Sequence, residues 1–197
     1  MTYREPATED LVTRVKEGDP AALGALYDRF ARRVYRFCLV RVGNHADAED
    51  LTQRVFLKMI ESIGGYRQRG TPFEAWLFRL ARNAAIDLLR ARRPRESIEA
   101  LAERASEEPG PGLLVELASD MADVRRAMAT LTDEQRDVIA YRFVAQLSSR
   151  ETAVAMGKRE GSVRALQFRA LQAIRRVLTS PPVGIFDDAS EGAGDAH

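Results

Sequence analysis

The stretch SSRETAVAMGKREGSVRALQFRAL, residues 148–171, decides the fold of the C-terminal part of the chain. It opens with a capping box, because Ser148 is followed three residues later by Glu151. Gly157 ends this short helix, and apolar residues return at helical spacing from Val163. A short helix, a turn with glycine and a longer basic helix form the helix-turn-helix pattern. The stretch therefore predicts a DNA-binding unit, the other interpretation being a purely structural helix pair.

The second helix of this unit would enter the major groove of DNA. Arginine suits guanine edges and phosphates there, and glutamine suits adenine. Leu166 has two interpretations: it belongs to the core stripe with Val163 and Ala170, or it faces the groove and offers only apolar contact. The candidate DNA contacts are Ser162, Arg164, Gln167, Phe168 and Arg169.

Capping signals and apolar spacing predict helices in the rest of the chain as well. Asp19-Pro20 is a helix start, and Thr132 with Gln135 forms a further capping box. No alternating strand pattern of convincing length occurs, so we expect an all-α protein. Besides the helix-turn-helix, the expected helices cover about residues 19–43, 47–64, 71–92 and 113–128.

Charge divides the chain into two small helical domains. Residues 67–95 are strongly basic, whereas residues 96–120 are acidic and contain the run Pro109-Gly110-Pro111-Gly112. Such a composition does not form a packed core, so this part is predicted to be an acidic flexible linker. We expect a first domain at 1–93, the linker at 94–112, a second domain at 113–178 and a disordered acidic tail at 179–197.

Composition excludes several classes of protein. No run of about 18 apolar residues occurs, and the N-terminus lacks the apolar core of a signal peptide, so we expect a cytoplasmic protein without membrane contact. Cys38 stands alone, and with only His45 and His197 besides we expect no disulfide and no metal site. A P-loop, a dinucleotide fingerprint and a catalytic set of residues are all missing, so we expect neither an enzyme nor a cofactor.

The predicted helix at 71–92 has a basic face beside a glycine-rich loop. Aromatic rings stack on unpaired bases and cations follow the backbone, so loop and face together suit single-stranded nucleic acid or a base drawn out of a duplex. A merely solvated face is the other interpretation, and Trp76 fits the core better than a ligand contact. The candidate residues are Tyr66, Arg67, Arg69, Arg79, Arg82 and Asn83.

Three stretches in this order resemble the bacterial sigma-70 factors, specifically the extracytoplasmic-function (ECF) type. DAEDLTQRVFLKMI, residues 47–60, is similar to region 2.2, which docks on the beta-prime clamp of RNA polymerase. FEAWLFRLARNAAIDLLRARR, residues 73–93, is similar to regions 2.3 and 2.4, which melt and read the minus-ten element. Residues 131–171 are similar to region 4, which reads the minus-thirty-five element and binds the beta flap.

The resemblance implies a transcription initiation factor that binds core RNA polymerase and recognises promoter DNA, both double- and single-stranded. It implies base recognition in the minus-ten element by Asn83, with the loop at 66–71 as a pocket. The resemblance also allows for an anti-sigma factor as a further protein partner. The acidic linker would lie near the RNA exit path or serve as a solvated tether. The implied polymerase contacts are Glu49, Asp50, Gln53 and Phe56.

The chain departs from the family pattern at three positions. Arg54 stands where Glu is common, which affects the clamp contact, and Ala165 and Leu166 stand where Ser and Arg are common in the reading helix. The alternative function is a polymerase-independent helix-turn-helix regulator with a helical effector or dimerisation domain. Such a regulator would bind duplex promoter DNA without polymerase.

Overall fold

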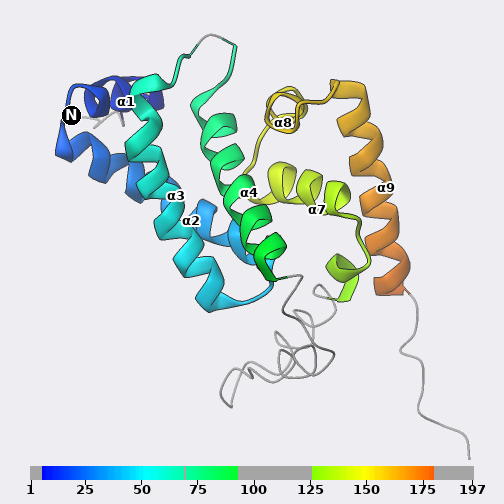
Figure 1. The fold of residues 1–197 in the computed structure, drawn as a ribbon. Coiled ribbons are helices and arrows are strands. Elements are labelled where there is room, and N and C mark those ends of the chain that lie inside the picture. Colours follow the sequence, from blue (N-terminus) through cyan, green and yellow to red (C-terminus); the bar gives the residue numbers. More distant parts are fainter. Residues whose placement is uncertain (1–5, 69, 93–125, 180–197) are drawn as a thin grey trace, which may run out of the picture.

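The computed structural model describes residues 6–68, 70–92 and 126–179, and every regular element in these ranges is helical (Figure 1). The prediction of an all-α chain is confirmed for them. None of the helices in these ranges has both the length and the apolar character that crossing a membrane requires. The predicted linker and acidic tail, most of the predicted helix at 113–128 and Arg69 lie outside the described residues.

The chain begins with α1 (Thr8–Lys16) and α2 (Pro20–Val42). Asp19 caps α2 as predicted, because its carboxylate accepts hydrogen bonds from the backbone N–H of Ala21 at 2.8 Å and of Ala22 at 3.3 Å. At the other end Gly43 adopts the left-handed conformation with φ 82°. The sequence analysis did not predict α1, a nine-residue helix without a side-chain cap.

The next helices are α3 (His45–Ser62), the short 3-10 turn η1 (Ile63–Gly65) and α4 (Phe73–Arg92). α3 begins slightly before the predicted position because Asn44 caps it and accepts a hydrogen bond from the Asp47 N–H at 2.9 Å. α2 packs against α1, α3 and α4, and we call these four the N-terminal helices. Their core includes Leu26, Phe30, Phe37, Leu51, Met59, Phe73 and Leu77.

The C-terminal helices are α7 (Asp133–Ile139), its π-helical continuation η2 (Ala140–Val144), α8 (Ser149–Met156) and α9 (Glu160–Thr179). The capping boxes predicted at Thr132 and Ser148 are confirmed, at the starts of α7 and α8. Gly157 ends α8 at φ 63°, and the helix-turn-helix has its predicted order. A small core lies between α7, α8 and α9; its members include Leu131, Val138, Ile139, Ala153, Val163, Leu166 and Ala170.

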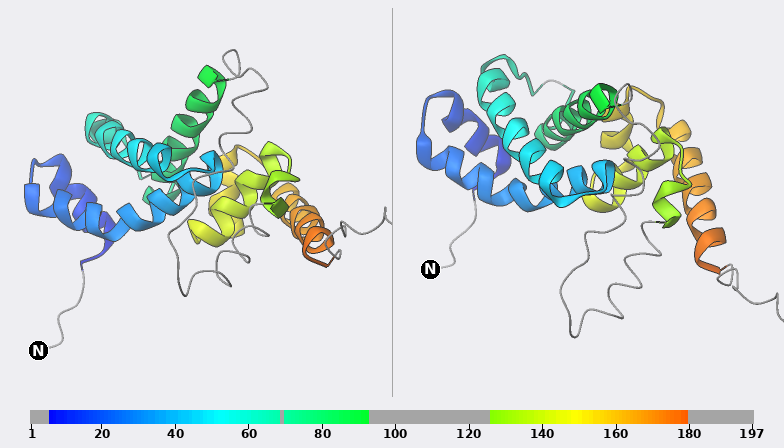
Figure 2. Two further views of the ribbon diagram at one scale, coloured as in Figure 1. Left: turned by 90° about the horizontal axis from the view of Figure 1, so that it is seen from below. Right: turned by 60° about the horizontal axis from the view of Figure 1, so that its bottom comes forward.

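The C-terminal helices pack against the N-terminal ones, alongside α2 and α4 (Figures 1 and 2). Tyr141 of η2 is fully buried in the N-terminal core, with its ring 5.1 Å from that of Phe37. Ala140, Ala145 and Leu147 belong to the same core. Part of the C-terminal group therefore packs into the core of the N-terminal helices, while α7, α8 and α9 keep a small core of their own, in agreement with the predicted two small helical domains.

Candidate functional site

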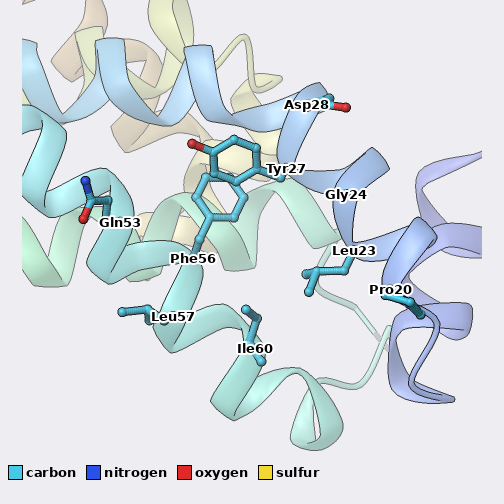
Figure 3. A pocket seen from close by; sticks show the side chains of 9 residues that line it. All are labelled: Pro20, Leu23, Gly24, Tyr27, Asp28, Gln53, Phe56, Leu57 and Ile60. Atoms are coloured by element: carbon cyan, nitrogen blue, oxygen red, sulfur yellow. The ribbon is translucent and has the colours of Figure 1, made fainter.

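An apolar groove of about 580 Å³ runs between α2 and α3 (Figure 3). Tyr27 of α2 is 47% exposed, and Leu57 of α3 is 61% exposed, so that together they form part of an exposed apolar patch. Phe56 lies underneath: it is buried, and its ring centre is 4.7 Å from that of Tyr27. The complete lining is Pro20, Leu23, Gly24, Tyr27, Asp28, Gln53, Phe56, Leu57 and Ile60.

Of the four predicted polymerase contacts, Gln53 and Phe56 line this groove, whereas Glu49 and Asp50 lie on α3 outside its lining. Gln53 lines it and is exposed, and Glu49 and Asp50 are exposed on the same helix. Phe56, by contrast, forms the floor of the groove and offers a partner little of its own surface. Arg54 is exposed and pairs with Asp50 at 2.7 Å, so the departure at position 54 draws one of the predicted acidic contacts into an ion pair.

The basic face of α4 is only partly open to solvent. Arg79 and Asn83 are exposed, as predicted. Arg82 is not free on this face, because its Nε donates a hydrogen bond to Asp137 of α7 at 2.5 Å. The prediction of an unobstructed basic face is therefore wrong at this residue: the C-terminal helices that cover it follow more than forty residues later in the sequence.

Tyr66 stands at the start of the loop after η1, but its side chain is not exposed there, which corrects its expected place in the capture pocket. It is buried, with its ring 5.0 Å from Trp76 and 5.8 Å from Phe73, and its hydroxyl donates a hydrogen bond to the Thr71 carbonyl at 2.8 Å. Burial raises the pKa of this hydroxyl. Trp76 is in the core as expected. Of the predicted loop residues, Arg67 is exposed and remains accessible to a nucleic acid.

α9 presents the surface that the helix-turn-helix pattern predicts. Ser162, Arg164, Phe168 and Arg169 are exposed, and Phe168 is 63% exposed. Gln167 is half-buried and accepts a hydrogen bond from Arg142 at 3.0 Å. Arg164 forms an ion pair with Glu160 one turn earlier, at 2.5 Å.

Leu166 belongs to the core, which settles the choice between its two interpretations. It is 7% exposed and packs in the C-terminal core with Val163 and Ala170. Ala165, the other departure in this helix, is exposed between the outward positions. The reading face of α9 is thus built without position 166.

Sequence reasoning missed the charged residues that lie between the two groups of helices. Asp137 and Arg41 are buried, and the Arg41 Nη1 lies 3.0 Å from the Asp137 carboxylate. A signal was present at Arg41, because this charge stands in the apolar run at 37–42, and a buried charge has to be paired. Asp137 gave no such signal, because the four residues before it are polar. A second missed pair joins Asp47 at the start of α3 to Arg92 at the end of α4.

No cluster of three or more histidine, cysteine or acidic side chains suited to a metal ion occurs among the described residues. Cys38 is buried in the core, where burial raises the pKa of its thiol to about 12. The charged groups of the described surfaces thus act through ion pairs and hydrogen bonds, in which arginines and lysines join carboxylates.

Two protein families match the chain in the order that the sequence suggested. Sigma-70 region 2 matches residues 26–95, and Sigma-70, region 4 matches residues 127–176. The ECF RNA polymerase sigma factor BldN of Streptomyces coelicolor is 36% identical over 187 residues, covering 89% of this chain and 70% of BldN. SigD of Mycobacterium tuberculosis, also an ECF RNA polymerase sigma factor, is 33% identical over 181 residues, covering 89% of this chain and 85% of SigD.

The chain therefore belongs to the sigma-70 family, within the ECF RNA polymerase sigma factors. These are transcription initiation factors that bind RNA polymerase, and the alternative of a polymerase-independent regulator is not favoured.

Solved structures agree on the fold. CnrH in complex with the cytosolic domain of CnrY superposes with a TM-score of 0.69 at 20% identity, covering 88% of this chain and 97% of CnrH. The sigma factor RpoE, in complex with the anti-sigma factor NepR from Bartonella quintana, gives a TM-score of 0.63 at 22% identity, covering 79% of this chain and 95% of RpoE.

Proposed function

We propose that the chain directs core RNA polymerase to its promoters through three separate surfaces. The face of α3 and the groove beside it bind the beta-prime clamp, α4 binds the minus-ten element, and α9 reads the minus-thirty-five element. This assigns residues 1–93 to clamp docking and minus-ten recognition, residues 113–178 to minus-thirty-five and flap binding, and residues 94–112 to the connection. The observation that carries the proposal is the helix-turn-helix, whose second helix buries one stripe and exposes Arg164, Phe168 and Arg169.

On α9 the exposed side chains are assigned to different kinds of DNA contact. Arg164 lies near the N-terminus of the helix, where residues of a recognition helix contact base edges. Arg169 and Ser162 suit phosphate contacts, which position the helix without carrying sequence information. Phe168 offers an apolar ring to a thymine methyl group.

On α4 the exposed Asn83 presents both a donor and an acceptor to a base edge, and Arg79 one turn earlier supplies positive charge for the backbone. Because the ring of Tyr66 is packed against Trp76, we assign it to supporting the loop rather than to stacking on a base. Arg67 is then the loop's contact to the single strand.

At the clamp, the charged rim and the apolar groove act together. Glu49, Asp50 and Gln53 offer acceptors to a basic partner helix, while Leu57 and Ile60 offer apolar area that stands 61% and 46% exposed. Exposed large side chains beside a polar rim are typical of protein interfaces. Phe56 acts from below by fixing Tyr27.

The chain has no chemistry of its own in this proposal, since the polymerase forms the phosphodiester bonds, and no cofactor is required. Its location follows that of its partner, which places it in the cytoplasm. An anti-sigma factor is a further proposed partner, since RpoE, which shares the fold, was crystallised with one.

Binding to core polymerase tests the proposal. Asp50→Ala with Gln53→Ala removes two contacts from one face of α3 and is expected to weaken binding about tenfold, the size of a central interface contact. Glu61→Ala, on the last turn of the same helix, is the matched control and should bind like the unmodified chain. Arg54→Glu frees Asp50 from its ion pair and should tighten binding.

Unchanged affinity of the double variant, with helicity intact by circular dichroism, would refute the clamp assignment. Specific binding of the free chain to duplex promoter DNA, equal to that of the polymerase complex, would instead support the polymerase-independent regulator.

A further inference from the structure

A lysine of α1 reaches the loop between η1 and α4. The Lys16 Nζ, in the last turn of α1, donates a hydrogen bond to the Tyr66 carbonyl at 2.7 Å. The same Nζ lies 5.2 Å from the centre of the Tyr66 ring. The two residues are 50 positions apart in the chain, so this contact ties the first helix to a distant segment.

Tyr66 connects the two ends of this loop. Its ring packs on Trp76 and Phe73, and its hydroxyl donates a hydrogen bond to the Thr71 carbonyl at 2.8 Å, shortly before α4 begins. Gly70, next to Thr71, turns the chain with φ 82°. A contact that holds Tyr66 in place therefore acts on both ends of the loop.

The carbonyl that Lys16 holds belongs to the peptide bond between Tyr66 and Arg67. A peptide unit is planar, so a hydrogen bond to its oxygen also restricts the direction in which the next residue leaves. The Arg67 Nη1 donates to the Gly64 carbonyl at 2.9 Å and to the same Tyr66 carbonyl at 3.3 Å. When the exposed Arg67 side chain extends toward a nucleic acid, it leaves this oxygen, and Lys16 still holds it.

α1 contacts the chain on the other side of the loop as well. The Thr8 hydroxyl, at the start of α1, donates a hydrogen bond to the Glu74 carboxylate at 3.4 Å, and its oxygen accepts one from Arg29 at 3.2 Å. Glu74 lies in the first turn of α4. α1 thus touches the chain before and after the loop. The match to Sigma-70 region 2 begins at residue 26, which leaves α1 outside it.

We propose that Lys16 is a positioning residue for minus-ten binding. It holds the Tyr66–Arg67 peptide in the geometry from which Arg67 reaches single-stranded DNA, and it does not contact the DNA itself, because its ammonium group lies against the Tyr66 carbonyl and ring. The inference rests on the proposed function for the identity of the DNA and for the role of Arg67. The anchoring of the loop by Lys16 does not depend on that function.

Fluorescence of the free, full-length chain tests the anchoring without DNA. Trp76 is the only tryptophan, and its ring lies 5.0 Å from that of Tyr66. Lys16→Met keeps most of the apolar stem but removes the ammonium group, so it should loosen Tyr66 and raise the quenching of Trp76 by acrylamide. Because Lys16 is exposed, the variant should fold with unchanged helicity. Lys58→Met removes an exposed lysine of α3 that pairs with Glu61 at 3.1 Å, and this matched control should leave the quenching unchanged.

Binding of single-stranded DNA by the complex with core polymerase tests the positioning. The probe is an oligonucleotide that the unmodified complex selects from a random pool. Lys16→Met should weaken binding about fivefold, the effect of losing one hydrogen bond of typical strength. Lys16→Arg should restore most of the affinity, because a guanidinium group can also donate to the Tyr66 carbonyl. Lys58→Met should bind like the unmodified complex.

A double-variant cycle separates positioning from direct contact. If Lys16 acts through Arg67, adding Lys16→Met to Arg67→Ala should cause no further loss of affinity. Additive losses would show that Lys16 contacts the DNA itself and would overturn the proposal. Unchanged affinity of folded Lys16→Met, where Arg67→Ala does weaken binding, overturns it as well. Unchanged affinity of Arg67→Ala, with raised Trp76 quenching in Lys16→Met, refutes the proposed function of the loop but supports its anchoring by Lys16.

Discussion

Cys38 shows how completely its position in the fold controls the chemistry of one side chain. It is fully buried in α2, and burial raises the pKa of its thiol to about 12, although a hydrogen bond with Thr52 acts in the opposite direction. Only the thiolate is nucleophilic, so Cys38 is a hydrophobic core residue at neutral pH.

Alkylation checks this directly. Iodoacetamide at pH 7.5 should modify Cys38 in the folded chain at least about a hundredfold more slowly than in urea, because reaction requires opening of the core. Reaction of the native chain at the rate of an exposed thiol would contradict the burial. Mass spectrometry of the intact chain measures both rates.

Asp19 combines a helix cap with a charge, and this makes its contribution dependent on pH. A hydrogen bond from Arg14, at 2.8 Å, and the backbone N–H of Ala22 lower the pKa of Asp19 below its usual value of 3.8. A lowered pKa in the folded state means that the stabilisation is present above the unfolded value and is lost as the pH falls through the folded one.

Asp19→Asn keeps a cap but removes the charge. The unmodified chain should therefore melt at a higher temperature than Asp19→Asn near pH 6, and the difference should disappear once the pH falls below the lowered pKa of Asp19. The comparison between the two chains cancels the titration of other groups. A difference that does not change with pH would show that the Arg14 contact contributes nothing.

At the level of helices, the sequence predicted best the starts and ends that depend on hydrogen bonds between residues close together in the chain. The capping boxes of α7 and α8 each depend on residues three apart, and both were located from the sequence. Gly157 was placed correctly for the same reason. Whether Leu166 faces the core or DNA stayed undecided from the sequence, because the answer depends on contacts with α7 and α8, which helical spacing alone does not define.

The surfaces were less predictable than the helices. Tyr66 follows two glycines and resembles a loop residue, yet its ring fills the core beside Trp76. Arg82 fits a basic helical face, yet it faces a carboxylate from a distant segment of the chain. Both depend on packing between elements, which periodicity within one element does not encode.

The burial of Leu166 leads to a prediction about α9. Leu166→Ala should lower the free energy of unfolding by about 2–5 kcal/mol through the lost contacts and the cavity, and Leu166→Arg should lower it further without creating a new guanine preference. Leu171→Arg is the control, since Leu171 is 41% exposed on the same helix. Urea denaturation measures the stability, and a gain of base preference in Leu166→Arg would show that this position faces DNA.

At the scale of the whole molecule, the packing between the two groups of helices couples them. Sequence analysis expected two small domains, because the basic and acidic segments are so distinct. In the structure α7 and η2 are covered on two sides: Val138 and Ile139 lie in the C-terminal core, whereas Tyr141 lies in the N-terminal one. Unfolding of the two groups is therefore expected to be cooperative.

Tyr141 permits a direct test, because Trp76 is the only tryptophan and lies in the N-terminal helices. For the unmodified chain, Trp76 fluorescence and far-ultraviolet circular dichroism should follow one urea transition. Tyr141→Ala should lower the free energy of unfolding by about 3–5 kcal/mol, as large-to-small changes of buried aromatic residues do. The change should weaken mainly the contact between the two groups of helices. Circular dichroism should then begin to change at a lower urea concentration than Trp76 fluorescence.

Tyr141→Phe is the matched control for this change. The Tyr141 hydroxyl has no hydrogen-bond partner among the described residues, and burial raises its pKa, so removing it leaves no group unsatisfied. Tyr141→Phe should keep coincident transitions and equal or higher stability. Coincident transitions in Tyr141→Ala as well would mean that the two groups remain coupled without this ring, and that the ion pairs of Asp137 and the remaining apolar contacts are sufficient to hold the two groups together.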